Sequence, residues 1–118
     1  MPGPERFPQR ERLTRQRDYL FIYRHGRKRV GDAFICYVVR RTGQGRKMGS
    51  AVSRKVGSAV VRNRVKRYIR EIYRKHRGLM PEDAHLVVVA RPASAGLDYP
   101  ACEARLCRLL QPGDATDA

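Results

Sequence analysis

The most distinctive chemical feature of the sequence is a run of cations between residues 58 and 77. At about 100° per residue, a helix over this stretch carries an apolar arc on one side. The members of that arc are Val61, Val65, Tyr68, Ile69 and Ile72. The opposite arc carries Asn63, Lys66, Arg67, Arg70 and Arg74. A guanidinium group can grip phosphate through two parallel hydrogen bonds and can stack on bases, so the pattern predicts a nucleic-acid-binding face.

A solvated charged face is the alternative interpretation of the same residues. Solvated faces usually mix both signs of charge, whereas Glu71 is the only acid among twelve cations between residues 46 and 77. Like charges one helical turn apart cost a few tenths of a kcal/mol per pair when nothing is bound. A bound polyanion would remove that cost, so the one-sided charge favours binding.

Four aromatic residues form a second candidate site. Tyr19 and Tyr23 are four residues apart in a helical pattern, and Phe34 and Tyr37 lie in the strand pattern that follows. If the helix packs beside the sheet, these rings line a groove that offers stacking surfaces for unpaired bases. Ordinary core packing remains the alternative. Phe34 and Tyr37 point to opposite faces of a strand, so at least one of them belongs to the core.

Groups for protein-based catalysis are few. His25, His76 and His85 are scattered, and the basic region contains no pair of carboxylates to hold a magnesium ion. A nuclease that relies on protein and metal alone is therefore disfavoured. The three cysteines, Cys36, Cys102 and Cys107, are odd in number and form no CxxC pair, which indicates reduced thiols in a cytosol.

The composition agrees with a polyanionic partner. The 118 residues contain 26 Lys and Arg against 11 Asp and Glu, a formal charge of +15, and the length fits one domain. The final third, from residue 78, holds three cations and six acids, so the first two thirds build the basic surface. The longest apolar run, residues 33–39, is too short to span a membrane. We expect a mobile Pro/Arg-rich arm over residues 1–12, a domain over 13–112 and a frayed tail over 113–118.

The first half of the chain predicts a helix and two strands. Thr14 can cap a helix over residues 15–25, and Gly26 can end it in a left-handed turn. Residues 32–41 and 48–53 are rich in strand formers and are expected to pair antiparallel across a flexible glycine-containing loop. A short edge strand around Arg29 is also compatible with the sequence.

The second half predicts a long helix, a strand and a last helix. Ser58 can cap the long helix, from residue 59 to about residue 77. Residues 85–90 (HLVVVA) read as a buried strand, and Asp98 can cap the last helix. The order is α-β-β-α-β-α, with the helices expected mainly on one face of the sheet.

The string from Met48 to Arg74, MGSAVSRKVGSAVVRNRVKRYIREIYR, resembles a known family. Its centre, Arg62-Asn63-Arg64 followed by Lys66-Arg67, is similar to the signature helix of the protein component of bacterial ribonuclease P. Residues 12–26 (RLTRQRDYLFIYRHG) are similar to the first helix of that family. The segment from His85 to Leu110 looks like its last strand and helix.

This resemblance implies a single-domain α+β sandwich similar to ribosomal protein S5 domain 2. It also implies a left-handed β-α-β crossover around the signature helix, which runs against the usual right-handed rule. The implied partners are the catalytic RNA of ribonuclease P, with its Mg²⁺ ions, and precursor tRNA. The implied reaction is hydrolytic removal of the 5′ leader of precursor tRNA in the bacterial cytoplasm, with the catalytic groups in the RNA.

The resemblance also implies roles for individual residues. Contact with the catalytic RNA falls on Arg62, Asn63, Arg64, Lys66, Arg67, Arg70 and Arg74. Contact with the single-stranded leader falls on Tyr19, Tyr23, Phe34, Tyr37, Arg54 and Lys55. Two rival functions stay open: a general or ribosomal RNA-binding module without a nuclease role, and a self-sufficient nuclease.

Overall fold

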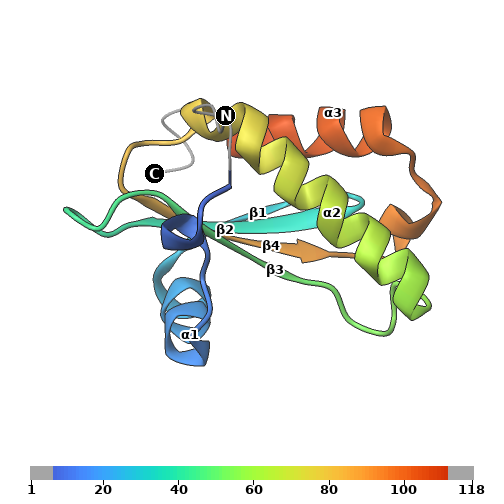
Figure 1. Cartoon of the computed structure of the whole chain (residues 1–118), viewed down its shortest axis with the longest axis horizontal. Helices are drawn as coiled ribbons and strands as arrows, with labels where there is room; N and C mark the ends of the chain where they lie inside the picture. Colours follow the sequence, from blue (N-terminus) through green and yellow to red (C-terminus); the bar gives the residue numbers. More distant parts are fainter. Residues whose placement is uncertain (1–6, 112–118) are drawn as a thin grey trace.

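The computed structural model describes residues 7–111 and contains one four-stranded sheet, in the order β1-β2-β4-β3 (Figure 1). The strands are β1 Arg27–Val30, β2 Phe34–Arg40, β3 Lys47–Ala51 and β4 Ala84–Ala90. The helices are α1 Gln16–His25, α2 Ala59–His76 and α3 Tyr99–Leu110. Short 3-10 helices cover Gln9–Glu11, Arg77–Leu79 and Pro92–Gly96. The mixed α+β class and the edge strand around Arg29 are confirmed.

Strand β4 occupies the centre of the sheet. Its residues form an almost unbroken apolar run, and all of them except Val89 are buried, as expected for a strand covered on both faces. It pairs antiparallel with β2 and parallel with β3. The predicted antiparallel pairing of residues 32–41 with 48–53 is therefore wrong, because β4 lies between these two strands.

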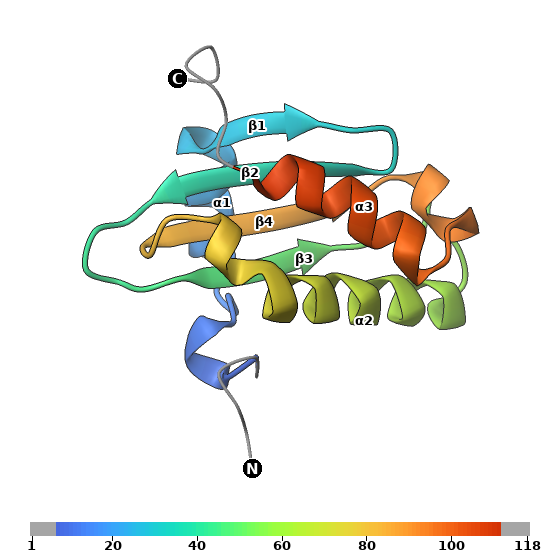
Figure 2. The same ribbon diagram turned by 90° about the horizontal axis from the view of Figure 1, so that it is seen from above.

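The connection from β3 through α2 to β4 is a left-handed crossover. In Figure 2 the sheet is seen from the side of α2 and α3, with the parallel strands β3 and β4 pointing to the right. The chain passes from β3 to the nearer helix α2 and returns to β4, which lies above β3 in that view. This is the hand that the family resemblance implies.

Helices cover both faces of the sheet. Alternating residues of β2 and β4, such as Phe34, Cys36, Leu86 and Val88, pack in the main core under α2 and α3. On the other face, Val87 packs in a smaller cluster with residues of α1 (Figure 1). The two longer helices thus share one face of the sheet, in agreement with the expectation that helices lie mainly on one face, and α1 covers part of the second face.

The observed ends of the helices show which of the predicted capping residues cap a helix. Ser58 Oγ accepts a hydrogen bond from the Val61 amide, and the Asp98 carboxylate accepts one from the Ala101 amide, so both predicted caps are confirmed. The Thr14 cap is wrong, because α1 begins at Gln16 and no side chain caps it. Gly26 is extended rather than left-handed. It is needed instead for close packing, since a Cβ there would lie 2.5 Å from the Ile22 carbonyl oxygen.

Residues 7–12, the second half of the predicted arm, pack against the domain. Glu11 is buried and accepts hydrogen bonds from Tyr73 Oη at 2.8 Å and from Arg77 Nη1 at 2.7 Å. The Phe7 ring meets the Tyr73 ring edge-on at a centroid distance of 5.3 Å. The rest of the predicted arm, residues 1–6, and the predicted tail, residues 113–118, lie outside the described residues.

Two further observations concern the described part of the chain. Between residues 7 and 111, no helix combines the length and the apolar character that crossing a membrane requires. Cys36, Cys102 and Cys107 are all free thiols, and burial raises the pKa of Cys36 to about 12.

Candidate RNA-binding surface

Helix α2 has the two faces that its sequence predicts. Val65, Ile69 and Ile72 are buried against the sheet, while Asn63, Arg67 and Arg70 are exposed on the opposite side. The pattern is shifted slightly from the prediction. Val61 and Tyr68 are only half-buried at the edges of the apolar arc, and Tyr73, which the arc did not include, is fully buried.

The cations assigned to RNA contact differ in their surroundings. Lys66, Arg67 and Arg70 form no ion pair within residues 7–111. We call this trio the open cations of α2. Because no acid of the described chain neutralises them, their charge is available to a polyanion outside the protein.

Two other predicted contact residues, Arg64 and Arg74, are tied into the protein, and a third, Arg62, is half-buried. Arg64 Nη2 donates to the Ala95 carbonyl at 2.6 Å. Arg74 pairs with Glu71 one turn earlier, and the hydrogen bond from Arg74 lowers the pKa of Glu71. Arg62 is half-buried, and its Nε has no hydrogen-bond partner among the described residues. The predicted cationic face is therefore not bare at Arg74, and the role of Arg64 in RNA contact stays a prediction.

Three tyrosines form an aromatic surface on the other face of the sheet, between α1 and the strands. We call Tyr19, Tyr23 and Tyr37 the tyrosine surface. The rings of Tyr23 and Tyr37 meet edge-on, with centroids 4.9 Å apart. The Tyr19 ring lies directly over Gly49 of β3, where a Cβ would come within 2.3 Å of Tyr19 Oη. Burial raises the pKa of Tyr19 and Tyr23, so both hydroxyl groups stay protonated at neutral pH.

The fourth predicted aromatic, Phe34, is not part of this surface. Its side chain is fully buried in the main core under α2 and α3. Tyr37 points to the opposite face of β2, toward α1. The structure thus decides the alternative that strand alternation left open, and Phe34 cannot stack on a base.

The remaining predicted leader contacts, Arg54 and Lys55, lie in the turn between β3 and α2. Both are exposed, and the turn is held by hydrogen bonds to Ser53. Within residues 7–111, no hydrogen bond or ring contact joins them to the tyrosine surface. Their assignment to leader binding stays a prediction.

The candidate metal-binding side chains of the described residues lie apart from one another. Nowhere in residues 7–111 do three His, Cys, Asp or Glu side chains come together as candidate ligands. The described part of the chain therefore does not fit a resident magnesium ion.

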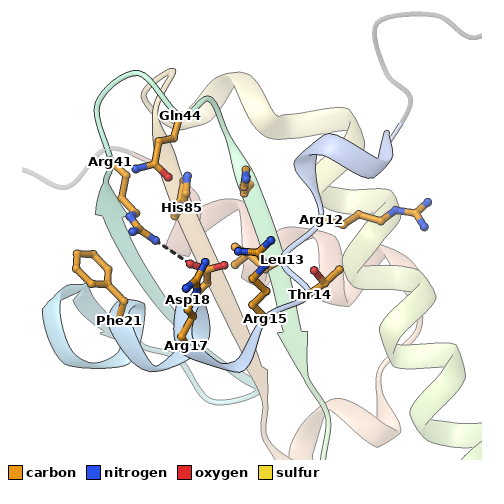
Figure 3. A pocket seen from close by; sticks show the side chains of 11 residues that line it. Arg12, Leu13, Thr14, Arg15, Arg17, Asp18, Phe21, Arg41, Gln44 and His85 are labelled. Atoms are coloured by element: carbon orange, nitrogen blue, oxygen red, sulfur yellow. Dashed lines mark hydrogen bonds and ion pairs between the residues drawn. The ribbon is translucent and has the colours of Figure 1, made fainter.

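The structure also contains a basic hollow that the sequence did not predict. Cations from the start of α1 and from the loop between β2 and β3 surround a hollow that is closed at its base by His85 (Figure 3). These segments are far apart in the sequence, so no local pattern joins them. The only available signal was the high density of Arg between residues 6 and 29.

Comparison with known proteins identifies the family. A family model described as Ribonuclease P matches residues 7–112, which include the basic helix, the tyrosines and the whole sheet. The chain belongs to the ribonuclease P protein family.

Relatives and solved structures agree with this assignment. The ribonuclease P protein component of Dictyoglomus thermophilum is 45% identical over 87 residues, covering 73% of this chain and 72% of the relative. That of Desulfovibrio desulfuricans is 43% identical over 108 residues, covering 88% and 83%. The RNase P protein structure from Thermotoga maritima superposes with a TM-score of 0.78 at 29% identity, covering 89% of this chain and 99% of that one. Ribonuclease P proteins are subunits of a ribonucleoprotein endoribonuclease, which implies an RNA partner for this chain.

Proposed function

We propose that this chain is the accessory protein of a ribonuclease P holoenzyme that matures the 5′ end of precursor tRNA. The outer face of α2 binds the catalytic RNA, and the tyrosine surface binds the single-stranded 5′ leader. The observation that carries this proposal is the trio of open cations on α2, exposed or half-exposed and without an acidic partner in residues 7–111.

The open cations act by neutralising phosphate charge. An RNA that approaches α2 releases condensed counterions as Lys and Arg replace them, which favours association. The same neutralisation lowers the repulsion between the catalytic RNA and its RNA substrate. The protein thereby helps two polyanions come together without supplying a reacting group.

The tyrosine surface adds a preference for unpaired nucleotides. An unpaired base can stack on an exposed aromatic ring, whereas a base inside a duplex is already stacked on its neighbours. Precursor tRNA has a 5′ leader and mature tRNA does not. Contacts at these tyrosines would therefore favour the substrate over the product.

Magnesium belongs to the RNA in this proposal. The described residues offer no cluster of ligands for the ion, so no step is assigned to a metal held by the protein. When bound by the partner RNA, magnesium would supply the activated water and the charge stabilisation that phosphodiester hydrolysis needs.

Reconstitution tests the proposal directly. The purified chain is assayed for 5′ cleavage of precursor tRNA with and without a ribonuclease P RNA, at a magnesium concentration where the RNA alone is slow. We expect stimulation only when both components are present. Cleavage by the protein alone would indicate a self-sufficient nuclease. RNA binding without stimulation, and without a preference for precursor tRNA, would indicate a general RNA-binding module.

A double variant links this stimulation to α2. Arg67→Ala with Arg70→Ala should weaken binding of the catalytic RNA and leave the thermal unfolding temperature unchanged, since both side chains are exposed. Arg27→Ala with Arg108→Ala is the matched control, because it removes the same charge from exposed positions on β1 and α3. Equal loss of RNA binding in the two double variants would argue against a specific role for α2.

A further inference from the structure

Gly49 lies in the middle of β3 and faces α1. It pairs with Val87 of β4, which is buried in the smaller cluster beneath that helix. A glycine inside a strand contributes no side chain to packing and weakens the strand. Backbone conformation does not require it here, since the glycines with positive φ in residues 7–111 are Gly43, Gly45 and Gly57. The reason for a glycine at this position is therefore the space above it.

The hydroxyl end of the Tyr19 side chain fills that space. A Cβ at Gly49 would lie 2.5 Å from Tyr19 Cζ and 2.9 Å from Tyr19 Cε2. Carbon atoms that are not bonded to each other prefer a separation of about 3.5–4.0 Å. The three atoms nearest to such a Cβ all belong to Tyr19. A methyl group at position 49 would therefore push this ring away from β3.

Tyr19 is held at both ends of its side chain. Its backbone belongs to α1, which is anchored on the sheet by the fully buried Ile22. At the other end, Tyr19 Oη donates a long hydrogen bond of 3.5 Å to the Leu13 carbonyl. Burial raises the pKa of the hydroxyl, and a hydrogen bond with the Ser50 backbone opposes this shift. The ring is thus fixed between α1 and β3.

The segment that receives the Tyr19 hydroxyl lies along the free edge of β3. The Leu13 amide donates to the Met48 carbonyl at 3.1 Å, and Arg12 forms a single parallel bridge with Met48. Leu13 is buried in the same cluster as Val87. Gly49 therefore lies where β3, the segment before α1 and α1 itself meet, and the seat of Tyr19 depends on all three.

Tyr19 forms one continuous surface with the other two tyrosines. Tyr23 follows it by one helical turn, and its ring meets Tyr37 edge-on. Burial raises the pKa of Tyr23, and the neighbouring hydroxyls of Tyr19 and Tyr37 raise it further. Moving Tyr19 would change the shape of this surface on its β3 side. A ring that is already fixed loses little conformational freedom when a base stacks on it, so its fixed position favours binding.

We propose that Gly49 is a positioning residue for leader binding, because its missing side chain seats the Tyr19 ring against β3, where an unpaired base of the leader stacks on it. The inference rests on the proposed function, in which the tyrosine surface binds the 5′ leader. Gly49 is buried and acts only through Tyr19. Helix α2 packs on the opposite face of the sheet, so a larger residue at position 49 leaves the open cations of α2 in place (Figure 1).

The ratio of affinities for precursor and mature tRNA tests this role in the reconstituted holoenzyme. Gly49→Ala should lower the ratio by at least about fivefold, the lower end of what one stacked base contributes. A partly unfolded variant would lower both affinities alike, so the ratio does not respond to a loss of folded protein. Gly78→Ala is the matched control, because it adds the same methyl group at an exposed position with no atom within 4 Å.

The outcome separates this inference from the proposed function. A parent holoenzyme that prefers precursor tRNA, together with an unchanged ratio in Gly49→Ala, would overturn the role of Gly49 alone. A parent holoenzyme without any preference would contradict leader binding itself, and the role of Gly49 would fail with it. An equal fall of the ratio in Gly49→Ala and Gly78→Ala would also overturn the inference.

A fluorescent base reports the stacking directly. The base 2-aminopurine is placed at one leader position at a time, and the position whose emission is quenched most by the parent holoenzyme is kept. Gly49→Ala should reduce this quenching at saturating protein, and Gly78→Ala should leave it unchanged. Full quenching in Gly49→Ala would show that Tyr19 stacks without its seat on β3.

A double variant shows whether Gly49 acts through Tyr19. Tyr19→Ala empties the space above the strand, so adding Gly49→Ala to it should change neither the affinity ratio nor the thermal unfolding temperature. This background also decides the case in which Gly49→Ala does not fold by itself, since the double variant should then fold like Tyr19→Ala. A further loss of stability or of the ratio in the double variant would mean that something other than Tyr19 needs the glycine, and would overturn the proposal.

Discussion

Among single residues, Tyr23 is the one on the tyrosine surface best placed to meet a base. It is 37% exposed, and its ring is braced edge-on by Tyr37. We predict that Tyr23→Ala removes about 1–3 kcal/mol from binding of precursor tRNA to the reconstituted holoenzyme, the range for one base stacked on an aromatic ring. Mature tRNA, which has no leader, should bind unchanged. Leu20→Ala, a truncation of an exposed apolar residue on the same helix, is the control. Filter binding of both tRNAs measures the effect, and an equal loss for the two would assign Tyr23 to packing alone.

His85 makes stability depend on pH. Its folded-state pKa is lowered, first by burial and then by Arg41 and Lys47. Below the ordinary histidine pKa of about 6.5, the unfolded chain takes up this proton more readily than the folded chain, so stability falls as the pH drops. We predict that the free energy of unfolding of the parent chain, minus that of His85→Gln, decreases from pH 7.5 to pH 5.5, because only the parent chain carries the histidine. Urea titrations in phosphate-free buffer measure this difference. A difference that stays constant would contradict a lowered pKa for His85 in the folded protein.

The outcome at Phe34 and Tyr37 shows what a sequence can decide about single residues. Alternation along a strand places the two rings on opposite faces, and this follows from backbone geometry alone. Which face receives the thicker layer of helices depends on where α2 and α3 pack, and those helices lie well beyond the strand in sequence. His85 was unassignable for the same reason, because the hollow above it is built by segments about 40 to 70 residues away along the chain.

Among the structural elements, the segment before α1, residues 7–12, packs across the C-terminal half of α2. Its anchor is the buried hydrogen bond from Tyr73 Oη to the Glu11 carboxylate, which Arg77 also contacts. We predict that Tyr73→Phe lowers the free energy of unfolding by about 1–3 kcal/mol, because it leaves a buried carboxylate short of one donor. Tyr68→Phe removes a hydroxyl that has no hydrogen bond among the described residues, so it should stay within about 0.5 kcal/mol of the parent chain. Chemical denaturation compares the two variants. Equal effects would show that the hydrogen bond from Tyr73 to Glu11 does not stabilise the packing of residues 7–12 on α2.

The elements that the sequence predicts well are those with local signals. Ser58 and Asp98 begin α2 and α3 as expected, because a cap depends on residues within one helical turn. The partner of β3 was predicted wrongly. A strand that follows another after a short loop usually pairs with it, but β4, more than thirty residues later in the chain, pairs with both. The left-handed crossover likewise has no local signal and was expected only from the family resemblance.

Across residues 7–111, most of the acids are used internally, while the open cations of α2 are left for a partner. Seven of the eight acids in residues 7–111 accept a hydrogen bond or form an ion pair inside the protein. They are Glu11, Asp18, Asp32, Glu71, Asp83, Asp98 and Glu103. The acids of the described residues therefore do not neutralise the open cations of α2, and the chain keeps a formal charge of +15. Such a distribution steers a polyanion toward the protein, at a cost in self-repulsion that binding relieves.

This distribution predicts how RNA binding depends on salt. Each phosphate that the protein neutralises adds about 0.7–0.9 to the slope of log affinity against log salt, so the parent chain should show a slope of several units with a ribonuclease P RNA. Arg67→Ala with Arg70→Ala should reduce that slope by about 1.4–1.8, since two phosphate contacts are lost. Arg27→Ala with Arg108→Ala removes equal charge elsewhere and should leave the slope unchanged. Filter-binding titrations over a fourfold range of salt measure all three. A parent slope near zero would mean that phosphate neutralisation does not drive the association, and the outer face of α2 would then need another role.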